Sequence, residues 1–549
     1  MEHFSYDVIV IGCGAAGLRA AIAVAEAGRS VCILSKASQG LGTSTVMSRG
    51  HFAGTRTGWT REKHLEATLK AGRGLNQADL VDALIQDAPD RLEEMVRWGL
   101  SAVTEKGQLY ALGPPPVWGK EIVRCLLAAA KGAGVQFRSG LTVAGIRIAD
   151  GAAGVLSYAT EPGRWIRFSS RTLVLATGGA GALFLRHDNP HRMLGEGYAL
   201  ALRAGAALQD MEFFQFLPLA VAEPGKMHFP IPSTIASKGR LINSRGEEIL
   251  DKYEIRERPA DVLARDRLSQ VLMYEMRTGD SVFLDLRGVS EKGWMEDALG
   301  SGKILQTRFR AARDPLRVAP TAHFCMGGVC IDPQGRTQVS GLYAAGEVTG
   351  GLHGANRIAG NALTEALVFG TRAGKAAALE ADASSPSREK QIQEEMIHSL
   401  FPGRRHGASA RPAELKKSLQ KFLWEDGGIL RKKEGLLRAM KGVEQIRGET
   451  FDLPPQATPP EIQGKLELRL AAETALLILE AALSREESRG AHFREDFPAE
   501  NDRLWRGHLE VFLIAGKPAW SFKPVPGSDA GNQKEGLSSR AVSDLKPKI

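Results

Sequence analysis

A glycine-rich turn near the N-terminus carries the clearest chemical signature in the sequence. Gly12, Gly14 and Gly17 form a G-x-G-x-x-G pattern directly after the apolar run Val8–Ile11, and an alanine-rich segment and a second apolar run follow. Glycines at this spacing permit a tight turn, let the backbone approach a pyrophosphate and let the next helix pack on the strand, with the phosphates at the positive end of that helix. The sequence therefore predicts a dinucleotide site.

The end of the second predicted strand leaves the type of dinucleotide open. Ser35 occupies the position where an acidic residue usually binds the ribose hydroxyls, and Lys36 follows it. A serine hydroxyl can still bind a ribose, whereas the lysine could favour a phosphate. NADP and FAD are both compatible with this stretch.

Length and charge limit the kind of protein this can be. The chain has 549 residues, 43% of them hydrophobic, which is too many for one ordinary core. It contains no run of about eighteen apolar residues and no leading segment typical of export, so we expect a cytoplasmic protein without a membrane span. The net charge of +8 arises from interspersed charges of both signs, so we do not expect nucleic acid as a partner.

The cysteines do not predict a metal site. Cys13, Cys32, Cys125, Cys325 and Cys330 are too few and too scattered for a disulfide framework or an iron-sulfur ligand set. We expect them to be small buried residues. No metal is predicted for this chain.

The order of glycine-rich and charged stretches predicts a discontinuous α/β fold. Strands that end in glycines recur at 171–181 and 341–346, whereas residues from about 210 to 315 lack this pattern. We therefore predict a Rossmann-like domain, interrupted by an inserted α+β domain and followed by a helical domain. The predicted boundaries are 1–210 and 316–381 for the Rossmann-like domain, 211–315 for the insertion, 388–505 for the helical domain and 524–549 for a disordered tail.

Motifs in the second half of the chain are more specific than any glycine loop. They are PTAHFCMGGV at Pro320–Val329, GLYAAGE at Gly341–Glu347, GLHGANRIAGNAL at Gly351–Leu363 and ESRGAHFREDFP at Glu487–Pro498. With the N-terminal turn, they make the chain resemble the flavoprotein family of succinate dehydrogenases, fumarate reductases and L-aspartate oxidases from Tyr6 to about Trp505. The resemblance implies FAD, a capping domain over the flavin, a helical C-terminal domain, and hydride transfer between flavin N5 and a carbon next to a carboxylate.

By this resemblance we expect FAD to be held without a covalent link. In the membrane-bound respiratory members, a histidine after the second strand carries the flavin covalently, and Ser44 stands at its position. A serine cannot form that link. The expected FAD-binding residues are Gly12, Gly14, Ala15, Ala16, Gly17, Ser35, Lys36, Thr43, Ser44, Thr45, Gly50, Ala144, Ala176, Thr177, Gly178, Gly179, Glu196, Glu347, Asn361 and Leu363.

His323 and Arg357 match the family's pair that holds a substrate carboxylate beside the flavin. A guanidinium presents a fork of donors to a carboxylate, and a histidine adds a donor whose charge responds to the ligand. We therefore expect both residues to be catalytic, and we expect a small carboxylate as the substrate.

The positions for the far end of the substrate depart from the family pattern. Leu217 and Leu219 stand where the family has a histidine and a threonine, and Ile231-Pro232 stands at a Thr-Glu pair. A second carboxylate would be poorly paired in such apolar surroundings, at a large free-energy cost. The resemblance therefore implies a substrate with a bulkier or less charged far end.

The proton-transfer position also departs from the pattern in this alignment. Ala260, just before an aspartate, stands where the family has the arginine that delivers or removes the proton. Alanine cannot transfer a proton, and loss of a general acid reduces rates by about a hundredfold to ten-thousandfold. Arg258 and Arg265 are therefore candidates for the catalytic role.

Three functional hypotheses follow. The leading one is an FAD-dependent oxidoreductase of the fumarate reductase and succinate dehydrogenase type, which would pass electrons to an iron-sulfur partner. L-Aspartate oxidase is the alternative within the family; Ser44 favours it, whereas Leu217 and Ala260 count against it. A flavin electron-transfer or ligand-binding subunit without the ancestral dehydrogenase chemistry is the alternative of another class, and it would explain Ala260.

Overall fold

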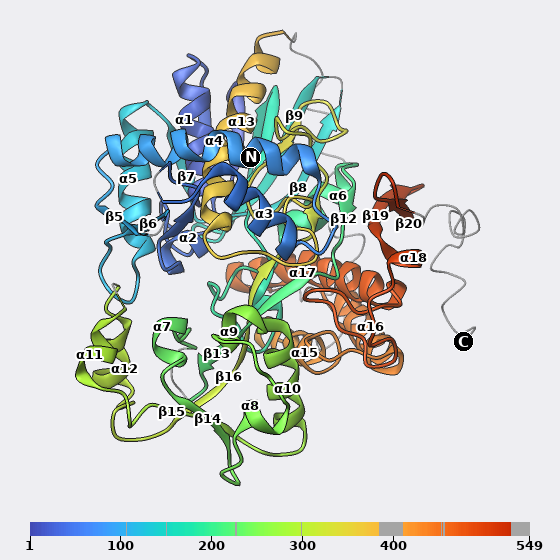
Figure 1. The fold of residues 1–549 in the computed structure, drawn as a ribbon. Helices are drawn as coiled ribbons and strands as arrows, with labels where there is room; N and C mark the ends of the chain where they lie inside the picture. The colour runs from blue at the N-terminus through green and yellow to red at the C-terminus, as the bar shows by residue number, and fades with distance from the viewer. Residues whose placement is uncertain are drawn as a thin grey trace.

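The computed structural model describes residues 1–528 apart from 57, 106, 150, 225–227, 298, 384–409, 452 and 454–455. The predicted tail therefore lies outside the described residues from 529 onward, and so does the 388–409 part of the predicted helical domain. The described part has a nucleotide-binding layer, an insertion and a C-terminal helical layer, which adjoin one another (Figure 1).

A five-stranded parallel sheet forms the centre of the first layer. Its strand order is β18-β11-β2-β3-β7. The central strands are apolar and buried along their whole length, as strands covered on both faces require. Helices α1 (Ala15–Glu26) and α13 (Asn361–Ala383) pack together against this sheet, and α5 (Gly119–Gly132) packs on α1. The strands are β2 (Val8–Ile11), β3 (Val31–Ser35), β7 (Gln136–Ser139), β11 (Thr172–Leu175) and β18 (Leu342–Ala344).

Two further sheets complete this layer. One has the order β1-β10-β9-β8 and the other the order β4-β6-β5. Their strands are β1 (Glu2–Ser5), β4 (His51–Ala53), β5 (Ala102–Glu105), β6 (Gln108–Ala111), β8 (Leu141–Ala149), β9 (Ala152–Ala159) and β10 (Arg164–Ser170). The remaining helices are α2 (Ser44–Met47), α3 (Arg61–Ala71), α4 (Ala78–Arg97), the 3-10 helix η1 (Gly181–Leu183) and α6 (Glu196–Arg203).

The insertion is built on an antiparallel sheet with the order β13-β16-β15-β14. Strands β13 (Phe214–Val221) and β16 (Leu316–Cys325) connect it to the first layer. Because β16 pairs with both β13 and β15, the predicted boundary between 315 and 316 falls within this sheet. The other elements are α7 (Ser233–Ala236), β14 (Arg240–Asn243), α8 (Ile249–Lys252), α9 (Ala260–Leu263), α10 (Arg265–Arg277), β15 (Val282–Asp285), α11 (Glu291–Met295) and α12 (Ser301–Arg308), drawn in green in Figure 1.

The C-terminal layer is mainly helical up to Trp505. Its helices are α15 (Pro412–Glu425), α16 (Lys433–Glu449), α17 (Pro459–Ser484) and α18 (Asp502–Trp505). A reciprocal capping box between Thr458 and Glu461 fixes the start of α17. Across the part of the chain that the structure describes, no helix is long and apolar enough to span a bilayer.

A C-terminal hairpin is absent from our sequence-based prediction. Strands β19 (Gly507–Ile514) and β20 (Lys517–Pro524) join β12 (Leu208–Gln209) and β17 (Gly328–Val329) in one sheet. Ala515 and Gly516 form the two-residue turn, with φ of 50° and 77°. Positive φ at both positions matches the twist of a hairpin. Ala-Gly is not a typical sequence for such a turn, whereas Asn-Gly or Gly-Gly would have predicted it.

The Glu487–Pro498 motif belongs to a buried ion cluster. The Arg485 guanidinium lies 2.5 Å from Glu212 and 3.1 Å from Glu487, and Arg489 lies 2.9 Å from Glu487. Removing one partner of such a pair leaves an uncompensated buried charge and is strongly destabilising. The cluster therefore fixes the C-terminal layer to Glu212, two residues before β13.

The glycine turn predicts a steric test of the fold. A Cβ added at Gly17 would lie 2.0 Å from the Gly12 carbonyl oxygen, so Gly17→Ala must force strand and helix apart. We expect the midpoint of thermal unfolding to fall by several degrees, since overpacking costs about 1–3 kcal/mol. Gly132→Ala, near the end of another helix with nothing within 4 Å, is the matched control and should not lower the midpoint. Equal midpoints for the two variants would contradict the packing described.

Candidate active site

One large cavity runs from the glycine turn to the insertion. Its volume is about 1220 Å³, and its walls come from both parts of the nucleotide-binding layer and from the insertion. Sites for one small molecule occupy about 300–1,000 Å³. The cavity is therefore large enough for a dinucleotide and a small second ligand.

At the nucleotide end of the cavity, backbone atoms rather than long side chains form the wall. Gly12 has φ of +115°, and a Cβ there would lie 2.0 Å from the Ala176 carbonyl oxygen. Helix α1 begins after Gly14 without a side-chain cap, although Thr45 Oγ1 accepts a hydrogen bond from Ala15 N at 3.0 Å. The helix N-terminus thus keeps unsatisfied N–H groups for phosphate oxygens.

Ser35 and Lys36 are both engaged by the protein itself. The Ser35 hydroxyl donates to the Ala37 carbonyl at 2.8 Å. Lys36 Nζ lies 2.5 Å from Glu196 Oε1 and donates to the Arg192 carbonyl at 2.6 Å. Because Glu196 pairs the lysine charge, Lys36 does not offer a free cation to a 2′-phosphate, and this geometry favours FAD over NADP.

Most of the predicted FAD-binding residues line the cavity, and five do not. The lining ones are Gly12, Gly14, Ala15, Ala16, Ser35, Lys36, Thr43, Ser44, Thr45, Ala176, Thr177, Gly178, Glu196, Glu347 and Leu363. The five that do not line it are Gly17, Gly50, Ala144, Gly179 and Asn361; a Cβ at Gly179 would lie 2.0 Å from Glu347 Oε1, and Asn361 hydrogen-bonds His64 and Thr68. The glycine pattern marks both kinds of position and does not separate them.

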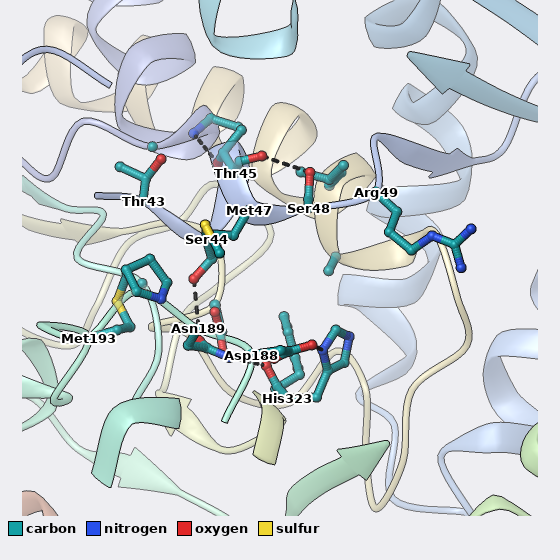
Figure 2. A pocket seen from close by; sticks show the side chains of 18 of the residues that line it. Thr43, Ser44, Thr45, Met47, Ser48, Arg49, Asp188, Asn189, Met193 and His323 are labelled. Atoms are coloured by element: carbon teal, nitrogen blue, oxygen red, sulfur yellow. Dashed lines mark hydrogen bonds and ion pairs between the residues drawn. The ribbon is translucent and has the colours of Figure 1, made fainter. Parts of the chain in front are cut away.

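Figure 2 shows the loop that contains Ser44 facing a second group of residues across the cavity. Ser44 Oγ lies 3.4 Å from Asn189 Oδ1, and Asn189 Nδ2 donates to the His323 carbonyl at 2.9 Å. The Asp188-Asn189 pair precedes a proline turn, and we did not predict it from the sequence as part of the site. The only available signal was its polar turn chemistry.

His323 is oriented by Asp188. Its Nδ1 lies 2.7 Å from Asp188 Oδ2, and both residues line the cavity. A carboxylate on one ring nitrogen fixes the plane of the imidazole and leaves Nε2 for a ligand.

Arg357 is held at the same place with only 7% of its surface exposed. Its Nη2 donates to Gln215 Oε1 at 2.8 Å, its Nη1 donates to the Ile358 carbonyl at 3.0 Å, and the guanidinium lies 4.5 Å from the Phe324 ring centre. Burial, and then the charge of Arg265, lowers the pKa of Arg357 to about 10. The group is a buried cation at neutral pH.

The structure shows which residues near the predicted proton-transfer position face the cavity. Ala260 is buried in the apolar cluster of the insertion and does not line the cavity. Arg258 also lies outside the lining, and its Nη1 donates to the carbonyls of Ile255 and Glu257. Arg265, the first residue of α10, lines the cavity and donates to the Arg357 carbonyl at 3.3 Å. The arginine that faces the site is therefore Arg265.

Arg265 and Arg357 form no ion pair with a carboxylate anywhere in the described part of the chain, and the Nε atoms of both are buried without a partner. Burial lowers the pKa of Arg265 as well. Buried charges are normally paired, so two guanidiniums of this kind in one cavity are suited to an anionic ligand.

The insertion contributes both polar side chains, among them Ser233, Thr234 and Lys238, and apolar side chains to the cavity wall. Leu217, Leu219, Ile231 and Pro232 all line the cavity, together with Leu299. The positions that we expected to be apolar therefore face the same space as the two arginines.

Comparisons with known proteins decide the family. The family model described as "FAD binding domain" matches residues 7–363, and the one described as "Fumarate reductase flavoprotein C-term" matches residues 416–530. The chain belongs to the fumarate reductase and succinate dehydrogenase flavoprotein family. It is an FAD-dependent oxidoreductase.

Relatives and solved structures resemble this flavoprotein over nearly its whole length. A fumarate reductase (CoM/CoB) subunit of Methanothermobacter marburgensis is 33% identical over 532 residues, which cover 90% of this chain and 95% of that protein. L-Aspartate oxidase of Synechocystis is 33% identical over 559 residues, which cover 92% of this chain and 97% of that protein. The FrdA chain of E. coli quinol fumarate reductase matches with a TM-score of 0.86 at 26% identity, and the match covers 96% of this chain and 97% of that chain.

The cavity of this flavoprotein fits FAD. Gly12 and Gly14 line the cavity at the start of α1, and a Cβ at Gly12 would collide with the Ala176 carbonyl, so this turn must stay bare backbone beside the helix N-terminus. Glu347 lines the same cavity, where its Oε1 accepts a hydrogen bond from Cys325 N at 3.1 Å. Burial raises the pKa of Glu347 to about 8, so this carboxyl is protonated at neutral pH and can itself donate a hydrogen bond.

The raised pKa of Glu347 predicts a pH-dependent stability of this flavoprotein. The ordinary pKa is 4.5 and the folded value is about 8, so the folded state keeps a proton that the unfolded state has lost. The stabilising contribution is therefore complete below 4.5 and is lost as the pH rises to about 8. Glu347→Gln cannot ionise. Between these two pH values the thermal midpoint of the wild-type holoenzyme should fall relative to that of Glu347→Gln, and a constant difference would contradict the assignment.

Proposed function

We propose that this flavoprotein transfers a hydride to or from a carbon next to a carboxylate, in a substrate whose far end bears no second carboxylate. Bound FAD supplies the hydride donor or acceptor. The bond that changes order joins carbon to carbon or to nitrogen. The protein's own residues bind the carboxylate, orient the substrate and hold the proton that the reaction moves.

The observation that carries the proposal is the pair of unpaired arginines. Arg357 lies beside His323 in the cavity that fits FAD, and neither Arg357 nor Arg265 meets a carboxylate among the described residues. A substrate carboxylate would satisfy the fork of Arg357 and, when His323 is protonated, accept a hydrogen bond from its Nε2. Gln215 and Asp188 keep these two donors in place.

Arg265 is the group that we propose for proton transfer. It lines the cavity next to Arg357, and burial lowers its pKa, which brings its proton closer to the range in which transfer is useful. Its neighbour Asp266 hydrogen-bonds Asn356, so the start of α10 is tied to the loop that carries Arg357. This arrangement supports Arg265 as the proton-transfer residue, a role that Ala260 cannot fill.

The apolar part of the cavity wall supports a substrate with an uncharged far end. Leu217, Leu219 and Ile231 offer no donor to a second carboxylate, and an ionised group against them would lose its hydration without compensation. This wall also counts against L-aspartate oxidase activity, which the similarity to the Synechocystis enzyme favours. Aspartate-dependent peroxide formation by the purified holoenzyme tests that alternative, and we expect none.

An iron-sulfur protein is our proposed electron partner. The chain's five cysteines are free, and no group of three or more metal-ligating side chains occurs within the residues that the structure covers. Reoxidation of the reduced holoenzyme by a reconstituted iron-sulfur protein, measured at increasing ionic strength, tests this pairing.

Arg265→Gln tests the proton-transfer role. We expect reoxidation of the dithionite-reduced flavin by crotonate, followed by stopped-flow absorbance, to slow by about a hundredfold to ten-thousandfold, because glutamine cannot donate a proton. Arg258→Gln is the matched control: its side chain lies on the same segment but outside the cavity, so the rate should stay within about twofold. A slow reoxidation in Arg258→Gln together with a near wild-type rate in Arg265→Gln would contradict the assignment.

Ser44 predicts that the FAD is dissociable. Its hydroxyl lines the cavity and pairs with Asn189, and a serine offers no nitrogen to bond the flavin ring. Acid precipitation of the holoenzyme should release all the flavin into the supernatant, measured by its absorbance. Fluorescent flavin that stays with the denatured polypeptide would contradict this prediction.

A further inference from the structure

His51 stands out among the polar residues of the cavity because neither the family motifs nor the proposed chemistry uses it. It lies on β4 directly opposite Tyr110 of β6, and the two rings stack at 4.7 Å with an angle of 7° between their planes. His51 Nε2 lies 2.7 Å from Gln108 Oε1, and the Tyr110 hydroxyl donates to the same oxygen at 2.8 Å. All three side chains line the cavity.

These contacts fix the tautomer of His51. An amide oxygen only accepts hydrogen bonds, so Nε2 must carry the proton that it donates to Gln108. Nδ1 then keeps a free lone pair. It has no hydrogen-bond partner among the described residues, and it is not among the polar atoms sealed from solvent, so it is open to the cavity.

The surroundings keep His51 neutral. Burial, and then the charges of Arg49 and Arg357, lowers the pKa of His51 to about 4. His51, His323 and Arg357 line the same cavity. Arg49 differs from Arg265 and Arg357 in having a carboxylate partner: its Nη2 lies 3.0 Å from Asp297 and 3.2 Å from Ser301, although its Nε is buried without a hydrogen-bond partner.

We propose that His51 determines the specificity of this cavity by accepting a hydrogen bond from an uncharged donor group of the substrate, such as a hydroxyl or an amide N–H. This inference rests on the proposed function, which places the substrate carboxylate at Arg357 and His323. It goes further by naming the chemistry of the far end. A carboxylate at the far end of the substrate would be repelled, because its oxygens and His51 Nδ1 are all hydrogen-bond acceptors. Arg49 would not offset this repulsion, because Asp297 already neutralises its charge.

Fumaramate and fumarate are the probes that test the inference. They are close in shape, but fumaramate carries an amide N–H group where fumarate carries its second carboxylate. We expect isothermal titration of the oxidised holoenzyme to give a dissociation constant at least about tenfold lower for fumaramate than for fumarate. A ratio near or below one in the wild type would overturn the proposal without any variant.

Variants test whether His51 causes the preference for fumaramate over fumarate. His51→Phe keeps a ring for stacking on Tyr110 but removes the acceptor, so the ratio should fall by at least about threefold. His51→Gln retains an amide oxygen and should restore part of the preference. His191→Phe removes another cavity-lining histidine, which we place outside the carboxylate and His51 contacts, and it should leave the ratio unchanged. Crotonate, which has a methyl group at the far end, should bind His51→Phe at least as tightly as it binds the wild type.

The remaining outcomes separate this inference from the proposed function. If the ligands bind and Arg357→Ala abolishes their binding, but the ratio is the same in His51→Phe, only the role of His51 is overturned. If His51→Phe instead shifts the flavin absorbance maximum without changing the ratio, His51 serves the flavin and the inference is again overturned. If no carboxylate binds, or binding is unaffected by Arg357→Ala, the proposed function and the inference both fail.

Discussion

The constraint on which this site depends is the presence of two adjacent guanidiniums without a carboxylate partner. Arg357 is buried at 7% exposure, and Arg265 shares its cavity. Burial, and then the charge of Arg265, lowers the pKa of Arg357, so both effects disfavour its charged form. The fold tolerates the two charges because neutral groups hold them: the Gln215 amide, backbone carbonyls and the face of Phe324. An anion that enters the cavity then gains both charges.

The rest of the molecule keeps that pair in place. Gln215 lies on β13 and Phe324 on β16, which are paired strands of the insertion. The same stretch of β13 begins two residues after Glu212, whose buried pairing with Arg485 ties it to the C-terminal layer. The helical layer is therefore part of the support of the site, although the structure places none of its residues in the cavity lining.

Much of this could be predicted from the sequence, because local chemistry and spacing decide it. The glycine turn predicted the dinucleotide cradle, and the loss of the glycine-rich pattern after residue 210 predicted the insertion. The motifs around His323 and Arg357 predicted that these two residues share a site, and both line the cavity, whereas their binding of a carboxylate stays a prediction. The hairpin at 507–524 was missed because its turn is Ala515-Gly516, which only the backbone reveals as a positive-φ pair. Arg258 and Arg265 were both predicted as catalytic candidates, and local sequence does not say which of them faces the cavity, as Arg265 does. The roles of Asp188 and His51 depend on partners distant in sequence, so no local pattern could show them.

The central claim is that the arginine pair takes the substrate carboxylate while the leucine wall takes the far end. A crystal structure of the holoenzyme with bound crotonate tests it most directly. The account predicts the carboxylate within hydrogen-bond distance of Arg357 and His323, with the methyl group against Leu217 and Leu219. A carboxylate bound elsewhere, or an Arg357 whose guanidinium is satisfied by FAD alone, would contradict it.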